Sequence, residues 1–152
     1  MSAPDSQFSE EHDEPVFVAI RASDPEIQRC KEEAQRTLGL FLRLYAEHKS
    51  SLGVYFAFKT PVRDGDDVAH LWYSFSGEQD GALLGEHFEL PPELKDRKHA
   101  RIQATDLEDW MINDHGVLYG GFSIRYQRSL LPKSERASFD RYTGVDRYEE
   151  IG

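Results

Sequence analysis

Cysteine is almost absent from this sequence, since Cys30 is the only one among 152 residues. A single cysteine can neither close a disulfide within the chain nor build a zinc site from several thiolates. The sequence also lacks any apolar run near the roughly 18 residues that a membrane span needs. Its first residues carry neither the basic nor the apolar segment of a secretory signal peptide. These absences predict a cytoplasmic protein with no membrane contact, no bound metal and no other cofactor.

Positive charge is also scarce. The chain has 18 Lys and Arg residues against 28 Asp and Glu residues, which gives a formal net charge of −10. Proteins that bind the phosphate backbone normally carry a basic face, so we expect no nucleic-acid partner. A strongly acidic protein is instead steered toward basic partner surfaces by long-range electrostatic attraction.

The length is that of one ordinary domain. Residues 1–15 are polar and acidic without Lys or Arg, which predicts a flexible lead, and residues 15–20 (Pro-Val-Phe-Val-Ala-Ile) predict an edge strand. We expect a single α+β domain over residues 16–128. Residues 129–152 are predicted to form a C-terminal arm or a short helix.

A strong helix start lies at Ser23-Asp24-Pro25-Glu26. Asp24 is a good N-cap, proline is favoured in the first turn, and Glu26 suits the positive end of the helix dipole. Apolar residues then recur at spacings of three and four as far as Tyr45. This pattern predicts one long amphipathic helix that ends near His48, with Gly39 in its interior.

Beyond residue 53 the apolar pattern changes to alternation, which is typical of strands. The predicted strands cover residues 54–59, 68–75, 82–88, 100–105, 110–112 and 117–127, with a turn over residues 113–116. Short turns between successive strands indicate antiparallel pairing. The predicted fold is therefore α+β, with the long N-terminal helix packed on a strongly bent antiparallel sheet of about five or six strands. A bulge predicted at Gly120 and Gly121 would supply part of the bend.

Three short segments carry a resemblance to a known family: His70-Leu-Trp72, Asp109-Trp110-Met111 and Gly120-Gly121-Phe-Ser-Ile-Arg125. In this order, after the Asp24-Pro25-Glu26 helix start, they resemble the YegJ-like bacterial proteins (domain of unknown function 2314). The resemblance covers roughly residues 23 to 128, so the acidic lead and the residues after Arg128 look like additions. It implies no activity to carry over, although small domains of this kind often lie beside secreted toxins as immunity proteins.

Two groups of residues are candidates for chemistry. His70 and Trp72 share one strand face and would line a pocket, or would simply pack and hydrogen-bond within the fold. Asp106, Glu108 and Asp109 precede Trp110 and invite a paired-carboxylate reading, but caps and turn contacts explain them as well. The 64–67 segment (Asp-Gly-Asp-Asp) lacks the spaced ligands of a calcium loop and predicts a turn.

Tyrosine is the better indication of an interface. A single helix cannot cover all four of the following tyrosines: Tyr55, Tyr73, Tyr119 and Tyr126. Tyrosine is favoured at protein–protein interfaces.

From these observations we expect a non-catalytic protein-binding module, an immunity or antitoxin-like protein that neutralises a partner toxin by direct binding. The partner would be a basic toxin encoded by a neighbouring gene. Two alternatives stay open. The first is a small ligand-binding or hydrolytic domain with a pocket between helix and sheet, walled by His70, Trp72, Asp109 and Trp110. The second is a structural subunit of a homo-oligomer.

Overall fold

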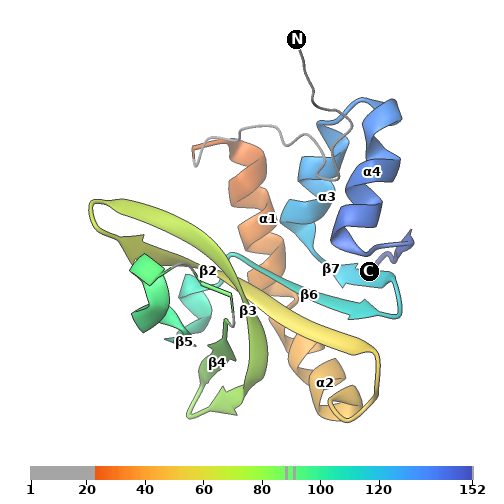
Figure 1. Cartoon of the computed structure of the whole chain (residues 1–152). Helices are drawn as coiled ribbons and strands as arrows, with labels where there is room; N and C mark the ends of the chain where they lie inside the picture. The colour runs from red at the N-terminus through yellow and green to blue at the C-terminus, as the bar shows by residue number, and fades with distance from the viewer. Residues whose placement is uncertain (1–22, 88, 91, 152) are drawn as a thin grey trace.

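A computed structural model describes residues 23–87, 89–90 and 92–151 of the chain (Figure 1). These residues form four α-helices and one seven-stranded sheet in the order β5-β4-β3-β2-β6-β7-β8. The predicted α+β class is confirmed, but the sheet has seven strands where five or six were expected. The predicted acidic lead and the strand over residues 15–20 lie outside the described residues.

The predicted single long helix is wrong, because two helices occupy its place. Helix α1 (Pro25–Arg36) begins as expected, with the Asp24 side chain accepting a hydrogen bond from the Glu26 amide at 2.9 Å. Helix α2 (Leu38–His48) follows directly after Thr37. The Thr37 hydroxyl donates to the Glu33 carbonyl at 2.6 Å and accepts the Trp110 indole N–H at 3.0 Å. This tie to the sheet holds Thr37 outside helical geometry and breaks the helix there.

Strands β2 to β5 follow one another as antiparallel neighbours, whereas β6 returns to pair with β2. β2 (Val54–Asp64) lies between β3 (Asp67–Gln79) and β6 (Asp109–Asp114). β4 (Ala82–Glu86) and β5 (His99–Ile102) extend the sheet beyond β3, and the 3₁₀ helices η1 (Pro92–Arg97) and η2 (Ala104–Asp106) flank β5. The predicted turn at residues 64–67 is confirmed, since Asp64 pairs with Asp67 across it.

The last part of the chain differs most from expectation. β7 (Val117–Gly120) pairs with β6 through the predicted turn, in which His115 and Gly116 have positive φ. The predicted strand over residues 117–127 is wrong beyond Gly120, because α3 (Phe122–Ser129) begins there. Helix α4 (Lys133–Thr143) and β8 (Arg147–Tyr148) follow, and β8 adds to the sheet parallel to β7.

No bulge forms at Gly120 and Gly121. Gly120 pairs in register with Met111, and Gly121 is the N-cap residue of α3, with both glycines at positive φ. A Cβ on Gly120 would lie 2.5 Å from the Trp110 carbonyl oxygen, so only glycine allows this close turn. The glycines therefore end the strand and redirect the chain into a helix.

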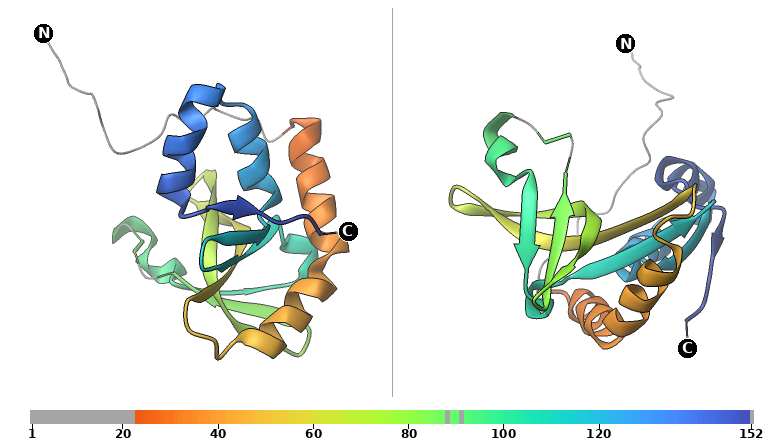
Figure 2. Two further views of the ribbon diagram at one scale, coloured as in Figure 1. Left: turned by 90° about the vertical axis from the view of Figure 1, so that its right-hand side faces the viewer. Right: turned by 90° about the horizontal axis from the view of Figure 1, so that it is seen from below.

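The core lies between one face of the sheet and the two N-terminal helices. Phe58 and its register partners Tyr73 and Trp110 pack there with Phe41 and Ala34. Figures 1 and 2 show α1, α3 and α4 standing side by side at one end of the sheet, with α2 at the other end of α1. No helix among the described residues combines the length and the apolar character needed to cross a membrane.

Candidate functional site

Asp109 lies at the corner where β6 meets α3, and its side chain is completely buried. Its carboxylate accepts hydrogen bonds from the amides of Trp110 (2.8 Å), Phe122 (3.0 Å) and Ser123 (2.8 Å), and from the Ser123 hydroxyl (2.6 Å). Gly121 has no side chain with which to cap α3, so Asp109 caps the helix from the neighbouring strand. The Asp109-Trp110-Met111 and Gly120-Gly121 segments are therefore two halves of one structural unit.

The electrostatics of this corner follow from its burial. Removal from water raises the pKa of Asp109 to about 6, although the hydrogen bonds from Ser123 and Phe122 pull in the opposite direction. All the donors that approach the carboxylate belong to the fold itself. Asp109 therefore has a complete structural explanation and no group left to offer a ligand.

Beside this corner an open cleft of about 670 Å³ separates the sheet from the helices. Its sheet wall carries Lys59, Trp72 and Met111, which point away from the face that holds the core. The opposite walls come from α1, α3 and α4. Small-molecule sites in proteins typically measure about 300–1,000 Å³, so the cleft is large enough for a ligand.

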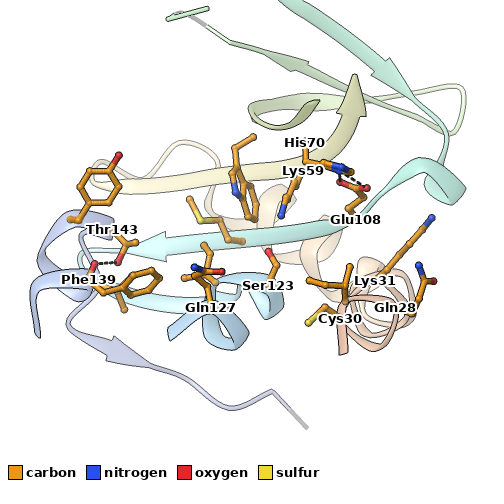
Figure 3. A pocket seen from close by; sticks show the side chains of 16 residues that line it. Gln28, Cys30, Lys31, Lys59, His70, Glu108, Ser123, Gln127, Phe139 and Thr143 are labelled. Carbon is orange, nitrogen blue, oxygen red and sulfur yellow. Dashed lines mark hydrogen bonds and ion pairs between the residues drawn. The ribbon is translucent and has the colours of Figure 1, made fainter. Parts of the chain in front are cut away.

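One end of the cleft is polar (Figure 3). His70 Nδ1 lies 2.9 and 3.0 Å from the two carboxylate oxygens of Glu108 at the rim. Lys59 extends from the sheet toward the helices, and Lys31 and Gln28 lie on α1 at the same end. Neither Lys31 nor Lys59 forms an ion pair with any of the described residues.

The other end of the cleft is mainly apolar. Figure 3 places Phe139 and Thr143 of α4 there, with Gln127 of α3 nearer the middle. The remaining side chains contributed by this part of the chain are Ile124, Tyr142 and Val145. The cleft thus runs from two ammonium groups to an apolar wall.

The nucleophilic side chains in the cleft are held in unreactive states. Burial, reinforced by the negative charge of Asp109, raises the pKa of the Cys30 thiol to about 11, so the reactive thiolate is scarce at neutral pH. The Ser123 hydroxyl donates to Asp109, whose oxygens already accept three backbone amides. Among the described residues, no three His, Cys, Asp or Glu side chains gather as metal ligands would.

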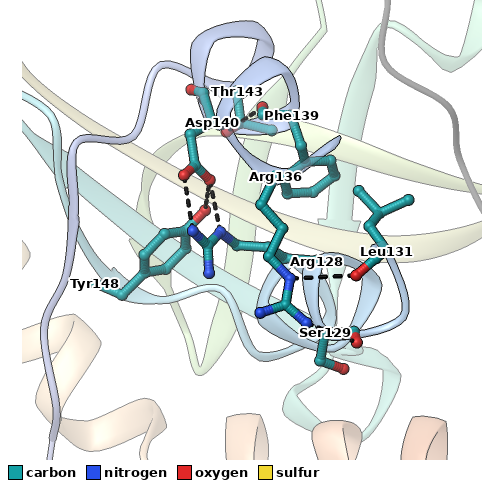
Figure 4. A network of polar contacts seen from close by, with 8 residues as sticks. All are labelled: Arg128, Ser129, Leu131, Arg136, Phe139, Asp140, Thr143 and Tyr148. Carbon is teal, nitrogen blue, oxygen red and sulfur yellow. Dashed lines mark hydrogen bonds and ion pairs between the residues drawn. The ribbon is translucent and has the colours of Figure 1, made fainter. Parts of the chain in front are cut away.

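A polar network fixes the position of α4 (Figure 4). Arg128 of α3 binds both carboxylate oxygens of Asp140 at 2.8 and 3.0 Å, and the Tyr148 hydroxyl donates to the same carboxylate at 2.5 Å. Burial raises the pKa of Asp140, but these hydrogen bonds outweigh it and leave the pKa below its ordinary value. The Arg128 guanidinium also lies 4.9 Å from the centre of the Tyr148 ring. These contacts tie α4, which carries part of the apolar wall of the cleft, to α3 and β8.

The structure separates the four predicted pocket residues. His70 and Trp72 both line the cleft, as their shared strand face suggested. Asp109 and Trp110 do not line it, because Asp109 is sealed beneath α3 and Trp110 is buried in the core on the other sheet face. The three acidic residues of the corner also diverge, since Asp106 is exposed and Glu108 pairs with His70.

The predicted tyrosine surface does not exist as one patch. Tyr73 is only 1% exposed and donates to the Arg97 carbonyl, so its assignment to an interface is wrong. Tyr119 packs partly against the core, and the Tyr126 hydroxyl donates to Asp24 at 2.6 Å. Tyr55 alone of the four is exposed, at 43%.

Most side chains of the cleft were not singled out for it from the sequence, and five of these bear on its chemistry: Lys31, Lys59, Cys30, Glu108 and Ser123. One usable signal existed for Lys59. It alternates with Phe58 on its strand and therefore had to face away from the core, on the side that His70 and Trp72 share. The other four come from elements whose packing against that face no local pattern encodes.

Residues 24–147 match the bacterial protein family of domain of unknown function 2314, described as an uncharacterized protein conserved in bacteria. The match extends past Arg128, where the resemblance was expected to end, and includes α4. A putative ankyrin repeat protein of Neisseria meningitidis serogroup B is 28% identical over 142 residues. The alignment covers 86% of this chain but 56% of that protein, so the chain spans about half of its relative. No solved structure matches significantly.

Proposed function

We propose that this chain, which belongs to the bacterial family of domain of unknown function 2314, is a non-catalytic binding module that holds a largely apolar ligand in the cleft. The observation that carries the proposal is the cleft itself, about 670 Å³ in volume and walled by Trp72, Met111, Ile124 and Phe139. A pocket with apolar walls and a few polar groups at one end is the usual form of a ligand site.

The polar groups argue for binding more than for catalysis. Nucleophilic catalysis needs an activated nucleophile beside a free base. Cys30 is shifted toward its protonated thiol, and the Ser123 hydroxyl is committed to Asp109. His70 pairs with Glu108 at the rim, and this pair would orient a polar group of the ligand.

A neutral apolar fluorescent probe, N-phenyl-1-naphthylamine, tests the proposal. The probe should bind the wild-type protein with enhanced emission. Ile124→Trp, which fills the cleft from α3, should weaken probe binding by at least about tenfold, because the bulky ring occupies the space of the ligand.

Leu130→Trp is the matched control, because Leu130 is the C-cap residue of the same helix, is 39% exposed and does not line the cleft. It should bind the probe as the wild type does, and both variants should keep the wild-type circular dichroism spectrum. A wild-type protein that leaves the probe unbound, or equal binding by both variants, contradicts the proposal.

A second candidate is the neutralisation of a basic partner protein, as an immunity protein does. Two observations favour it: the net charge of −10, and the relative whose name places it among ankyrin repeat proteins, a class with extended binding surfaces. Co-expression with the product of the adjacent gene tests it. Rescue of growth together with a stable purified complex supports neutralisation, and failure of both rejects it.

The homo-oligomeric alternative stays a prediction, as does the cytoplasmic location. Sedimentation velocity decides the first directly. A concentration-independent monomer of 17.5 kDa would exclude a structural role that depends on self-association.

A further inference from the structure

The polar end of the cleft contains two lysines, and the one on the sheet wall, Lys59, is attracted by the charge of Asp109 from beyond ion-pair distance. Lys59 is half-buried on the sheet wall, and Lys31 is half-buried on α1. Neither ammonium group lies within ion-pair distance of a carboxylate among the described residues. Partly buried ammonium groups favour a counter-ion, because removal from water costs free energy that an ion pair offsets.

Two carboxylates of this corner already accept hydrogen bonds from the fold. Asp109 is the register partner of Lys59 and attracts it, but the Asp109 oxygens accept the amides that begin α3 and form no ion pair with the ammonium group. Glu108 is held by His70 through both of its oxygens. The N–H donors of Lys59 and Lys31 are therefore available to the anionic group of a ligand.

The rest of the cleft limits what that anion can be. Its other end is formed by Ile124, Phe139 and Val145, which offer no charged group. A small hydrophilic anion would leave this apolar wall exposed to water, whereas a ligand with an apolar tail would cover it. The occupant that fits both ends is amphipathic.

The charge of the head group is limited as well. Glu108 lies at the same end as the lysines and repels added negative charge (Figure 3). Glu108 and Asp109 together balance the charge of the two lysines, so a second negative charge on the ligand would meet as much repulsion as attraction. The lysines also offer single-point donors, not the planar fork with which arginine grips phosphate.

We infer that the cleft binds an amphipathic monocarboxylate, with the carboxylate at the Lys59 ammonium group, Lys31 adding attraction from the rim, and an acyl chain along the wall of α3 and α4. This inference rests on the proposed function and names the chemical class of its ligand. Only binding is involved, and no bond of the ligand is made or broken.

Isothermal titration calorimetry at pH 8 with decanoate and decanol, below their aggregation concentrations, separates head group from tail. Decanoate should bind the wild-type protein at least about tenfold more tightly than decanol, the usual gain from a charge-assisted hydrogen bond. Lys59→Met and Lys31→Met keep the unbranched stem of the side chain and remove its charge, so each should reduce this preference. The double variant should abolish it.

Lys49→Met is the matched control, because Lys49 is exposed at the end of α2 and outside the cleft. It should keep the full preference for decanoate. The preference should also weaken as salt is raised from 50 to about 500 mM, since screening acts on the head group and not on the tail.

The possible failures are distinguishable. Equal affinity for decanoate and decanol, or a preference that survives in the double variant, overturns the inference and leaves the proposed function standing. Tighter binding of decyl phosphate than of decanoate also overturns the assignment to monocarboxylates. If neither decanoate, decanol nor the neutral naphthylamine probe binds, the proposed function fails and the inference fails with it.

Discussion

Asp109 and Lys59 face each other across β6 and β2, yet their surroundings are opposite. Asp109 is fully buried, and four donors from the fold saturate its carboxylate. Lys59 is half-buried at the edge of the cleft and has no ion-pair partner among the residues that the structure describes. Polar groups that a fold satisfies completely hold it together, whereas polar groups left unsatisfied beside a cavity are available to a ligand.

The largest expected effect is that of Asp109→Ala. Removal of the carboxylate leaves three backbone amides and one hydroxyl without their hydrogen-bond acceptor, and α3 loses its cap. The free energy of unfolding should fall by about 3–5 kcal/mol in urea denaturation. Asp106→Ala is the control, because Asp106 is exposed in η2 and should change stability by less than about 0.5 kcal/mol. Equal effects of the two substitutions would remove Asp109 from its structural role.

Gly120→Ala should come next. Its methyl group would press on the carbonyl and ring of Trp110, and the positive φ of 69° strains any other residue. We expect a loss of about 2–4 kcal/mol in the free energy of unfolding. Gly39→Ala is the matched comparison, because its Cβ would meet open space within α2, and it should stabilise by up to about 1 kcal/mol. If Gly120→Ala is neutral, the close turn onto α3 is not what ends β7.

The pH dependence of Asp109 should be smaller. Its pKa is about 6 in the folded protein against an ordinary value of 3.8, so the folded state binds the proton more tightly than the unfolded state does. This contribution is complete below pH 4 and is lost as the pH rises through 6. The stability of the wild type relative to Asp109→Asn should therefore fall by up to about 3 kcal/mol between pH 4 and pH 7. A relative stability that rises over this interval contradicts the assignment.

The smallest effect should be that of Lys59→Met. No ion pair among the described residues is broken and the apolar stem is kept, so the free energy of unfolding should change by less than about 0.5 kcal/mol or rise slightly. The preference for decanoate over decanol should decrease in the same variant. A loss of stability above about 2 kcal/mol would mean that Lys59 serves the fold, and the contrast with Asp109 would collapse.

The sequence predicted the elements whose signals are local. The cap at Asp24, the turn at residues 64–67 and the turn before Val117 are each written within a few residues, and each is present. The break at Thr37 is different, because its hydroxyl is held by Trp110, 73 residues away. The change from β7 to α3 was missed for the same reason. Its cap is Asp109, 13 residues before Phe122, and no capping residue precedes the helix locally.

The candidate site was predictable to a similar extent. Strand alternation put His70 and Trp72 on one face, and both line the cleft. His70 lies on β3, and Glu108 directly precedes β6. The two strands are brought close because β2 lies between them in the sheet, and no residue spacing in the sequence reveals this strand order. Lys31 enters the site because α1 packs beside α3, and α3 itself was read as a strand. The polar end of the cleft is therefore a product of tertiary packing.

The methyl carbon spectrum of methionine tests the account most directly. The chain has two methionines, Met1 and Met111, and Met111 lies in the cleft wall. Titration of ¹³C-methyl-methionine protein with decanoate should shift the Met111 signal until saturation, and the same titration of Ile124→Trp should leave it in place. A Met111 signal that stays unmoved in the wild-type protein at saturating decanoate would contradict a ligand site between the sheet and α3.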